Sequence, residues 1–223
     1  MPMSTRSSLW KKCATVSVNH LFWLGGSPCG GKSSVIDWLS HHFHIPVYHI
    51  DAHIDRHLAM ITPETQPALH RWETQTWDQR WLQPLDQLLQ NAIDCYTEHF
   101  YLLLPELLEL SATGPLIVEG NPLLPALIQP CLANPSHAIY LVAPPALLRQ
   151  YYRQRDWAVT VLKQSSDPEQ AFSNWMERDI AFARHVEAQC RQYHLRYLVS
   201  DENLSIETKA KEVAEHFGLD SGL

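Results

Sequence analysis

The sequence predicts an α/β fold in which helices cover both faces of a five-stranded parallel sheet. Three observations lead to this prediction: five short apolar runs recur along the chain, helical patterns separate them, and the first run ends at the glycine-rich segment Gly26–Ser34. Parallel strands need long crossover connections, which helices usually supply. Apolar runs that alternate with helical patterns therefore indicate a parallel sheet.

The composition is that of a folded protein without a general attraction for polyanions. Hydrophobic residues make up 45% and charged residues 18% of the 223 residues, which allows a sizeable core. The formal net charge of −7 gives no attraction to nucleic acid or to an anionic membrane. We expect one domain over residues 1–223, without a nucleic-acid or membrane partner, as a monomer or a homodimer.

The cysteines and the apolar runs together favour a cytoplasmic location. The five cysteines are scattered and form no C-x-x-C pair, which suits a reducing compartment better than a disulfide framework. The lead-in, residues 1–19, has no apolar core of the kind that a secretory signal needs, and the apolar stretches are too short to span a bilayer.

The segment Gly26–Ser34 matches G-x-x-x-x-G-K-S, the phosphate-binding P-loop pattern. Its glycines allow the backbone to turn successive N–H groups toward phosphate oxygens, and the helix that follows adds its positive end. Lys32 supplies a mobile charge for the β- and γ-phosphates, and the Ser33 hydroxyl can ligate Mg²⁺. We therefore predict that a nucleotide binds to Gly26, Ser27, Pro28, Cys29, Gly30, Gly31, Lys32, Ser33 and Ser34.

The surroundings of this segment argue against a chance match in a glycine-rich turn. The apolar run at residues 20–25 ends at the first glycine, as a buried strand would. A helical apolar pattern then runs from Ser33 to about Phe43. Strand, loop and helix follow one another as the motif requires.

Two further apolar runs lead to carboxylates. Residues 45–51 end in Asp51, and residues 115–120 contain Glu119. Because the carboxyl ends of parallel strands meet at one edge of a sheet, both carboxylates should lie beside the P-loop. Asp51 is predicted to act as the catalytic base or to organise Mg²⁺ together with Ser33, and Glu119 to contact metal or substrate. The alternative for each carboxylate is a helix cap or an arginine pair.

Residues 53–111 have a helical pattern far longer than an ordinary crossover, and we expect them to cover the substrate side. Within this part, Pro84 is expected to start or kink a helix and Pro105 to break one. For Trp77 and Trp81 we favour packing within the cover. The residues predicted to line an acceptor pocket are Asp51, Asp55, Arg56, Trp72, Arg80, Glu119 and Asn121.

The histidine-rich run at residues 49–57 leaves a transition-metal site as an alternative. His53 and His57 are four residues apart, so they can share one helix face. The spacing fixes no third ligand, so we prefer to place these residues near the acceptor pocket.

The runs at residues 138–142 and 196–199 complete the five strands, and an arginine-bearing lid region, residues 146–190, lies between them. Arg149 and Arg153 are four residues apart and would repel each other on one helix face. A bound anion between them would turn this cost into a gain, while a solvated helix face is the alternative. The residues predicted to clamp the transferring phosphoryl group are Arg149, Arg153 and Arg155.

Two long helices are predicted near the end of the chain. Residues 172–190 are spaced as one helix, on which Arg178 and Arg184 are weaker candidates for phosphate contacts. The final helix covers residues 206–217, and Gly218 is predicted to cap it.

The sequence resembles the P-loop kinases of the nucleoside-monophosphate-kinase-like group, which includes shikimate kinases, gluconate kinases and chloramphenicol phosphotransferases. The resemblance covers residues 20–218 and rests on the P-loop, on Asp51, on the run Ile117–Pro122 and on the lid arginines. It implies a three-layer P-loop fold with strand order 2-3-1-4-5, a helical substrate cover and an arginine-bearing lid. It also implies that the protein uses ATP and Mg²⁺.

The sequence departs from two members of this group. The run Glu119–Pro122 is similar to the Asp-Gly-Phe-Pro-Arg signature of adenylate kinases, but Leu123 stands in place of the arginine. This change weakens the case for a nucleoside monophosphate acceptor. Shikimate kinases have Asp-x-Asp after the second strand, whereas Asp51 and Asp55 are four residues apart, which argues against shikimate.

These observations favour a small-molecule kinase that transfers the γ-phosphoryl group of ATP to a hydroxyl or phosphate acceptor. The alternative is a regulatory or toxin-like P-loop ATPase that acts on a protein partner. The sequence has neither an N-K-x-D run nor an L-S-G-G-Q run, which argues against a GTPase and a transport ATPase. The acceptor stays open, because the P-loop contacts the phosphates of the donor alone.

Overall fold

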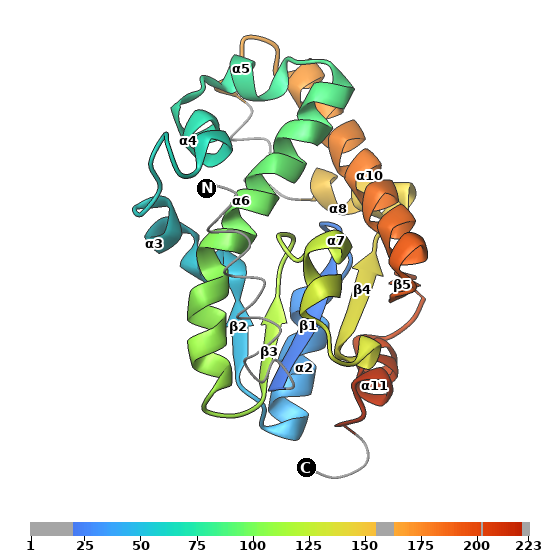
Figure 1. The fold of residues 1–223 in the computed structure, drawn as a ribbon. Coiled ribbons are helices and arrows are strands. Elements are labelled where there is room, and N and C mark those ends of the chain that lie inside the picture. Colours follow the sequence, from blue (N-terminus) through green and yellow to red (C-terminus); the bar gives the residue numbers. More distant parts are fainter. Residues whose placement is uncertain (1–19, 155–162, 202, 220–223) are drawn as a thin grey trace.

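The computed structural model describes residues 20–154, 163–201 and 203–219, and a five-stranded sheet forms its centre. The strands are β1 (Leu21–Gly26), β2 (Val47–His49), β3 (Leu116–Glu119), β4 (Ala138–Val142) and β5 (Arg196–Val199). All neighbouring strands pair in parallel, in the order β2-β3-β1-β4-β5 (Figure 1). The predicted fold class and strand order are confirmed. The predicted lead-in and Arg155 lie outside the described residues.

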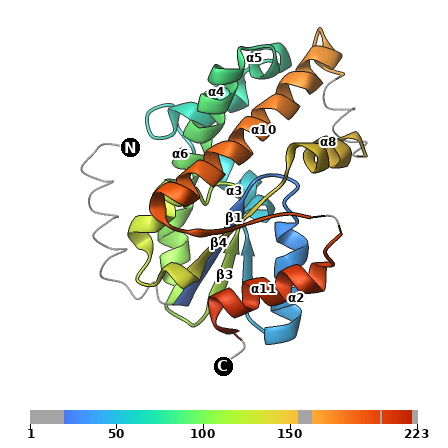
Figure 2. The ribbon, with the colours of Figure 1, turned by 90° about the vertical axis from the view of Figure 1, so that its right-hand side faces the viewer.

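Helices cover both faces of the sheet because side chains along each strand alternate between the two faces. Trp23 and Val118 belong to the core on one face, and Leu24 and Ile117 to the core on the other. The first core is completed by α6 (Leu85–Ser111), α7 (Pro125–Ile128) and α10 (Pro168–Tyr193), the second by α2 (Lys32–Phe43) and α11 (Ile206–Phe217). Figure 2 shows these two helical layers on opposite sides of the strands.

The chain between β2 and β3 forms the helical cover. It contains the short 3₁₀ helix η2 (Ile50–His53), then α3 (Ile54–Leu58), α4 (Pro67–Thr74), α5 (Trp77–Trp81) and the long helix α6. In Figure 1, α4, α5 and the first half of α6 lie beyond the carboxyl ends of the strands. Helix α10 packs against both α5 and α6, so it forms part of the same roof.

The remaining elements connect the layers. The short 3₁₀ helices η3 (Gln129–Cys131) and η4 (Pro135–His137) link α7 to β4, and α8 (Pro145–Arg153) follows β4. Helix α11 ends at Gly218, whose φ of 72° is the left-handed conformation of a helix cap, so the predicted cap is confirmed. None of the described helices combines the length and the apolar character needed to cross a membrane.

The expectation that Pro105 breaks a helix is wrong. Helix α6 begins directly after Pro84, as expected, but continues through Pro105 to Ser111. Leu104 and Leu107, on either side of the proline, are fully buried against the sheet. Burying one leucine side chain contributes about 1.5–3 kcal/mol to stability. The two leucines together therefore outweigh the cost of about 3 kcal/mol that a proline causes inside a helix.

The close approach of the P-loop to β4 depends on a glycine. Gly26 has φ of 133°, and a Cβ atom there would overlap the backbone carbonyl oxygen of Leu141. Gly114 has a similar φ of 147°, but a Cβ atom there would meet no atom within 4 Å. Adding a side chain would therefore strain the backbone at both positions, but only at Gly26 would it also overlap a neighbouring strand.

We expect Gly26→Ala to lower the free energy of unfolding more than Gly114→Ala does, by about 2 kcal/mol or more, because only the first change forces two strands apart. Urea unfolding of both variants, followed by circular dichroism, measures this difference. Equal losses of stability in the two variants would show that the chain accommodates the Cβ atom at position 26 without a free-energy cost.

Candidate functional site

The P-loop is held in place by hydrogen bonds to the neighbouring strands. The N–H of Ser27 donates to the carbonyl of Leu141 at 3.0 Å, and its Oγ accepts from the N–H of Ala143 at 2.8 Å. From the other side, Ser200 Oγ, just after β5, donates to the carbonyl of Gly30 at 2.6 Å. The loop is thus fixed to β4 and to the end of β5 before any ligand binds.

Two left-handed residues shape the middle of the loop. Cys29 has φ of 59° and Gly31 has φ of 81°, and Gly31 is the residue that caps the start of α2. Alternation of this kind turns backbone N–H groups to one side, and the start of α2 adds its own unpaired N–H groups. These donors suit a phosphate group.

Lys32 lies over the loop and reaches Asn121, the second residue after β3. Its side chain is buried, and Nζ donates to the carbonyl of Ser27 at 2.8 Å and to Asn121 Oδ1 at 2.9 Å. The structure therefore brings together two of the predicted site residues, Lys32 and Asn121, which are far apart in the sequence.

Ser33 and Glu119 also meet, as neighbours at the carboxyl edge of the sheet. Ser33 Oγ donates to Glu119 Oε2 at 3.4 Å. The same carboxylate oxygen lies 3.1 Å from His49 Nδ1, and His49 Nε2 lies 3.3 Å from Asp37 Oδ1. His49 therefore bridges two carboxylates. From the sequence His49 was expected near the acceptor pocket, as part of the histidine-rich run; in the structure it pairs with Glu119 in the parallel register of β2 and β3.

The oxygen atoms of Ser33 and Glu119 form a donor set that fits Mg²⁺. Mg²⁺ prefers hard oxygen ligands, and it usually keeps several waters and takes further oxygens from substrate phosphates. One hydroxyl and one carboxylate are therefore sufficient. Among the described residues, no group of three or more His, Cys, Asp or Glu side chains is arranged to hold a metal ion.

Asp51 follows β2 by two residues. Strand β2 ends at His49, and Asp51 is exposed in the first turn of η2. Burial raises the pKa of Tyr96 on α6 to about 12, and the negative charges of Asp179 and Asp51 contribute to this rise. Of the two predicted carboxylates, Glu119 is the one that contacts Ser33, and the base and magnesium roles of Asp51 stay predictions.

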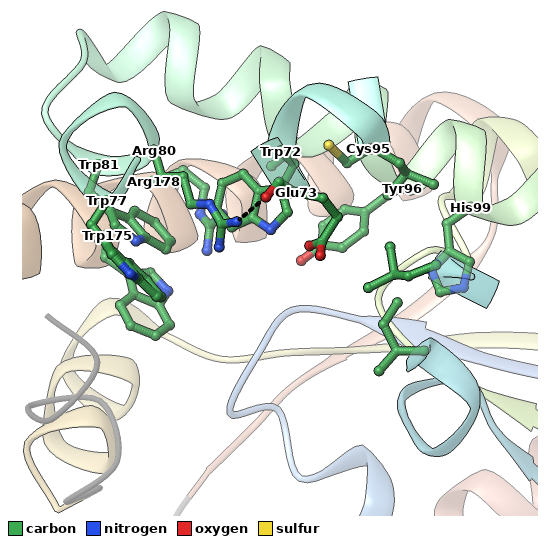
Figure 3. A pocket seen from close by; sticks show the side chains of 14 residues that line it. Trp72, Glu73, Trp77, Arg80, Trp81, Cys95, Tyr96, His99, Trp175 and Arg178 are labelled. Atoms are coloured by element: carbon green, nitrogen blue, oxygen red, sulfur yellow. Dashed lines mark hydrogen bonds between the residues drawn. The ribbon is translucent and has the colours of Figure 1, made fainter. Parts of the chain in front are cut away.

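A cavity of about 400 Å³ lies under the helical cover, and we call it the tryptophan cavity. Side chains from α3, α4, α5, α6 and α10 line it (Figure 3). The aromatic and cationic residues of its wall include Trp72, Trp77, Arg80, Trp81, Trp175 and Arg178. Trp72 and Arg80 were predicted to line an acceptor pocket, whereas Trp175 was not recognised and Arg178 was only a weaker candidate for phosphate.

The wall of the tryptophan cavity is held by ring contacts. Trp81 meets the edge of Trp72, with ring centroids 5.4 Å apart, and stacks on Trp175 at 4.6 Å. The guanidinium carbon of Arg80 lies 5.0 Å from the Trp72 ring, and that of Arg178 lies 4.9 Å from the Trp81 ring. Each arginine is thus held by an aromatic face, which orients its charge.

Two predicted pocket residues lie on the outer side of the cover. Arg56 is exposed and forms an ion pair with Glu106, with Nη2 2.7 Å from Oε1, and it also donates to the Tyr48 hydroxyl. Asp55 is exposed in the first turn of α3. Neither residue lines the tryptophan cavity, whereas Ile54, which precedes them in the chain, lines it.

The described lid arginines do not line the cavity beside the P-loop. Arg149 forms an ion pair with Glu177 of α10, and Arg153 is exposed at the end of α8. Helix α8 presents Leu147 and Tyr151 to the cavity instead, from its opposite face. The phosphate role of these arginines stays a prediction.

The cavity beside the P-loop has a volume of about 380 Å³, and we call it the loop cavity. Besides loop residues, it is lined by Leu147, Tyr151, Ser200, Ile206 and Lys209. The cations that line it in the described part of the chain are Lys32 and Lys209. Lys209 was not recognised from the sequence, because nothing in the pattern of the final helix distinguishes it.

Two buried histidines connect the tryptophan cavity to α3. His99 lines the cavity, and its Nε2 lies 2.8 Å from His57 Nδ1. On its other side, His57 Nε2 lies 3.2 Å from the Tyr48 hydroxyl. Burial, together with a smaller contribution from the neighbouring His57, lowers the pKa of His99 to about 4.

We expect stability to fall on acidification because of His99. Below its ordinary pKa of 6.5 the unfolded state takes up a proton, whereas the folded state does so only near pH 4. The free energy of unfolding should therefore decrease between these values, by up to about 3 kcal/mol from this residue. Urea unfolding at several pH values measures the decrease.

The control is His41→Gln, which changes an exposed histidine. We expect His99→Gln to reduce the dependence of the free energy of unfolding on pH, and His41→Gln to leave it unchanged. The same pH dependence in both variants would exclude His99 as its source.

Comparisons with known proteins leave the family and the substrate open. No protein-family model matches the sequence, and no curated protein matches it either. Among solved structures, shikimate kinase from Aquifex aeolicus vf5 is similar, with a TM-score of 0.42 and 15% identity, over 90% of this chain and 98% of that chain. A similarity this low carries no information about the family or the acceptor.

Proposed function

We propose that this protein is an ATP- and Mg²⁺-dependent kinase that phosphorylates a hydroxyl or phosphate group of a small molecule. One observation carries the proposal. The P-loop and the tryptophan cavity lie at the same carboxyl edge of the sheet, and the long insertion between β2 and β3 builds the second cavity. A nucleotide switch needs no second small-molecule cavity, whereas a kinase must hold its acceptor close to the γ-phosphate.

The loop cavity supplies what a nucleotide donor needs. Loop N–H groups and Lys32 are suited to the phosphates. Tyr151 and Ile206 are exposed hydrophobic side chains that line the same cavity, so they offer an apolar wall to a base. We expect Ser33 and Glu119 to hold Mg²⁺, which neutralises phosphate charge as it develops during transfer.

Transfer to a hydroxyl group requires one proton acceptor on the acceptor side. The acceptor oxygen forms a bond to the γ-phosphorus while the bond from that phosphorus to the β–γ bridging oxygen breaks, and ADP leaves. In this proposal Asp51 takes the proton of the acceptor hydroxyl, because it is exposed and close to Tyr96 of the tryptophan cavity. Arg149 would join the phosphates only by exchanging its partner Glu177.

We expect Lys32→Ala and Asp51→Asn each to lower kcat by about a hundredfold or more, because the first removes a phosphate charge and the second the base. Asp51→Asn should still bind ATP, since Asp51 lies on the acceptor side. ADP release and mass spectrometry of the product, in a screen of sugars, nucleosides, antibiotics and hydroxy acids, measure transfer.

Asp86→Asn, an exposed change at the start of α6, is the matched control and should retain full activity. Full turnover by Asp51→Asn would remove Asp51 from the mechanism. ATP hydrolysis that appears only after a protein partner is added would favour the regulatory ATPase instead.

A further inference from the structure

Two buried N–H donors of the tryptophan cavity, Arg80 Nε and Trp81 Nε1, have no hydrogen-bond acceptor among the described residues. Both residues belong to α5 and line the cavity. Buried donors are nearly always satisfied in folded proteins, and an exception is costly. Two exceptions in one wall therefore point to a ligand that supplies acceptor atoms.

The donor side chains of this wall are fixed in place. Trp81 is only 3% exposed, and its ring is stacked on Trp175. The neighbouring Arg178 is 10% exposed in its side chain, and its Nε forms an ion pair with Asp179 Oδ1 at 2.6 Å. The other oxygen of Asp179 accepts from Tyr152 and Trp175. A ligand would therefore meet a preorganised group of donors, which lowers the entropy cost of binding.

Arg80 gives this end of the cavity a positive charge. Its Nη2 donates to the backbone carbonyl of Glu73 at 3.1 Å, a contact that does not neutralise the guanidinium. Its guanidinium carbon lies 5.0 Å from the ring of Trp72 and 5.1 Å from that of Trp77. Figure 3 shows Arg80 and Arg178 beside each other, next to the tryptophans.

The rest of the lining is mostly apolar. Ile54, Leu58, Leu69 and Ala92 contribute to it, together with the ring of Tyr96, and its polar side chains are Glu73, Cys95 and His99. Figure 3 shows His99 well away from the arginines. A ligand that fills this cavity therefore meets a mostly apolar wall and a group of cationic donors, with the Glu73 carboxylate as the counter-charge. Such a wall offers little to a sugar, whose hydroxyl groups need polar partners all around the ring.

We propose that the tryptophan cavity selects an acceptor with a flat apolar ring and one anionic carboxylate or phosphate group, the anion lying against Arg80, Trp81 and Arg178. That this ligand is the phosphoryl acceptor rests on the function proposed above. A cationic ligand is disfavoured because guanidinium groups already occupy the faces of Trp72 and Trp81. Charged hydrogen bonds to arginine favour an oxyanion.

Calorimetric titration without ATP tests the proposal. The probes are para-hydroxymethylbenzoate and para-hydroxymethylphenyl phosphate, with benzene dimethanol as the neutral analogue, para-aminomethylbenzyl alcohol as the cation and hydroxymethylcyclohexane carboxylate as the non-aromatic acid. We expect an anionic aromatic probe to bind about tenfold or more tightly than the neutral and cationic probes. The better of the two anions tells carboxylate from phosphate.

Variants assign the anion to its donors. Arg80→Gln and Trp81→Phe should each weaken binding of the anionic aromatic probe severalfold and leave the neutral probe unaffected, because both changes retain much of the packing. Arg191→Gln, a change of an exposed arginine in the last turn of α10, is the matched control and should change neither. Equal binding of charged and neutral probes, no binding of any probe, or a preference that survives both cavity changes would overturn the proposal.

The outcomes separate this proposal from the proposed function. Lys32→Ala should lose transfer but keep binding of the anionic probe, since Lys32 does not line the tryptophan cavity. Selective anion binding without transfer to any acceptor would defeat the kinase assignment and leave the cavity assignment standing. Transfer to a neutral or cationic acceptor, with no preference for anions, would support the kinase assignment and defeat the cavity assignment.

Discussion

The structure depends on how closely the P-loop approaches β4. Gly26 leaves no room for a side chain against Leu141, and the N–H of Ser27 bonds to the carbonyl of that same residue. This contact fixes where α2 begins, and α2 in turn places Lys32 and Ser33. The chemistry of the donor side is therefore set by backbone packing in the sheet, before any polar side chain contributes.

The parallel register then brings the partners of these residues to the same edge. Glu119 stands level with His49 on one neighbouring strand and with Leu24 on the other. The ends of β2 and β3 thus meet beside the start of α2, where Ser33 and Asn121 complete the group with Lys32. Residues about a hundred positions apart become neighbours because all the strands run in one direction.

The sequence was sufficient for most elements and for the strand–loop–helix arrangement of the P-loop, because those depend on local patterns. Apolar periodicity indicates strands and helices, and the P-loop carries its own chemistry in consecutive residues. It was not sufficient for contacts between distant segments. Arg149 and Arg153 share a face, as predicted, but packing of α8 decides where that face points.

The tryptophan cavity shows the same limit more clearly. Trp72 and Arg80 were recognised as pocket residues, but Trp175 and Arg178 reach the cavity from α10, and no spacing in the sequence connects them to α5. Pro105 failed as a helix breaker for a related reason, since the burial that sustains α6 comes from the sheet. Local rules were overruled wherever tertiary packing supplied more free energy.

The insertion between β2 and β3 has a consequence for how the protein can diversify. Within the described chain, the tryptophan cavity and the loop cavity share no lining residue. The first is built by the insertion and α10, the second by the P-loop, α8 and the start of α11. The scaffold is modular in this sense: exchanging α4 and α5 could give it a new specificity while the machinery for the donor is inherited intact.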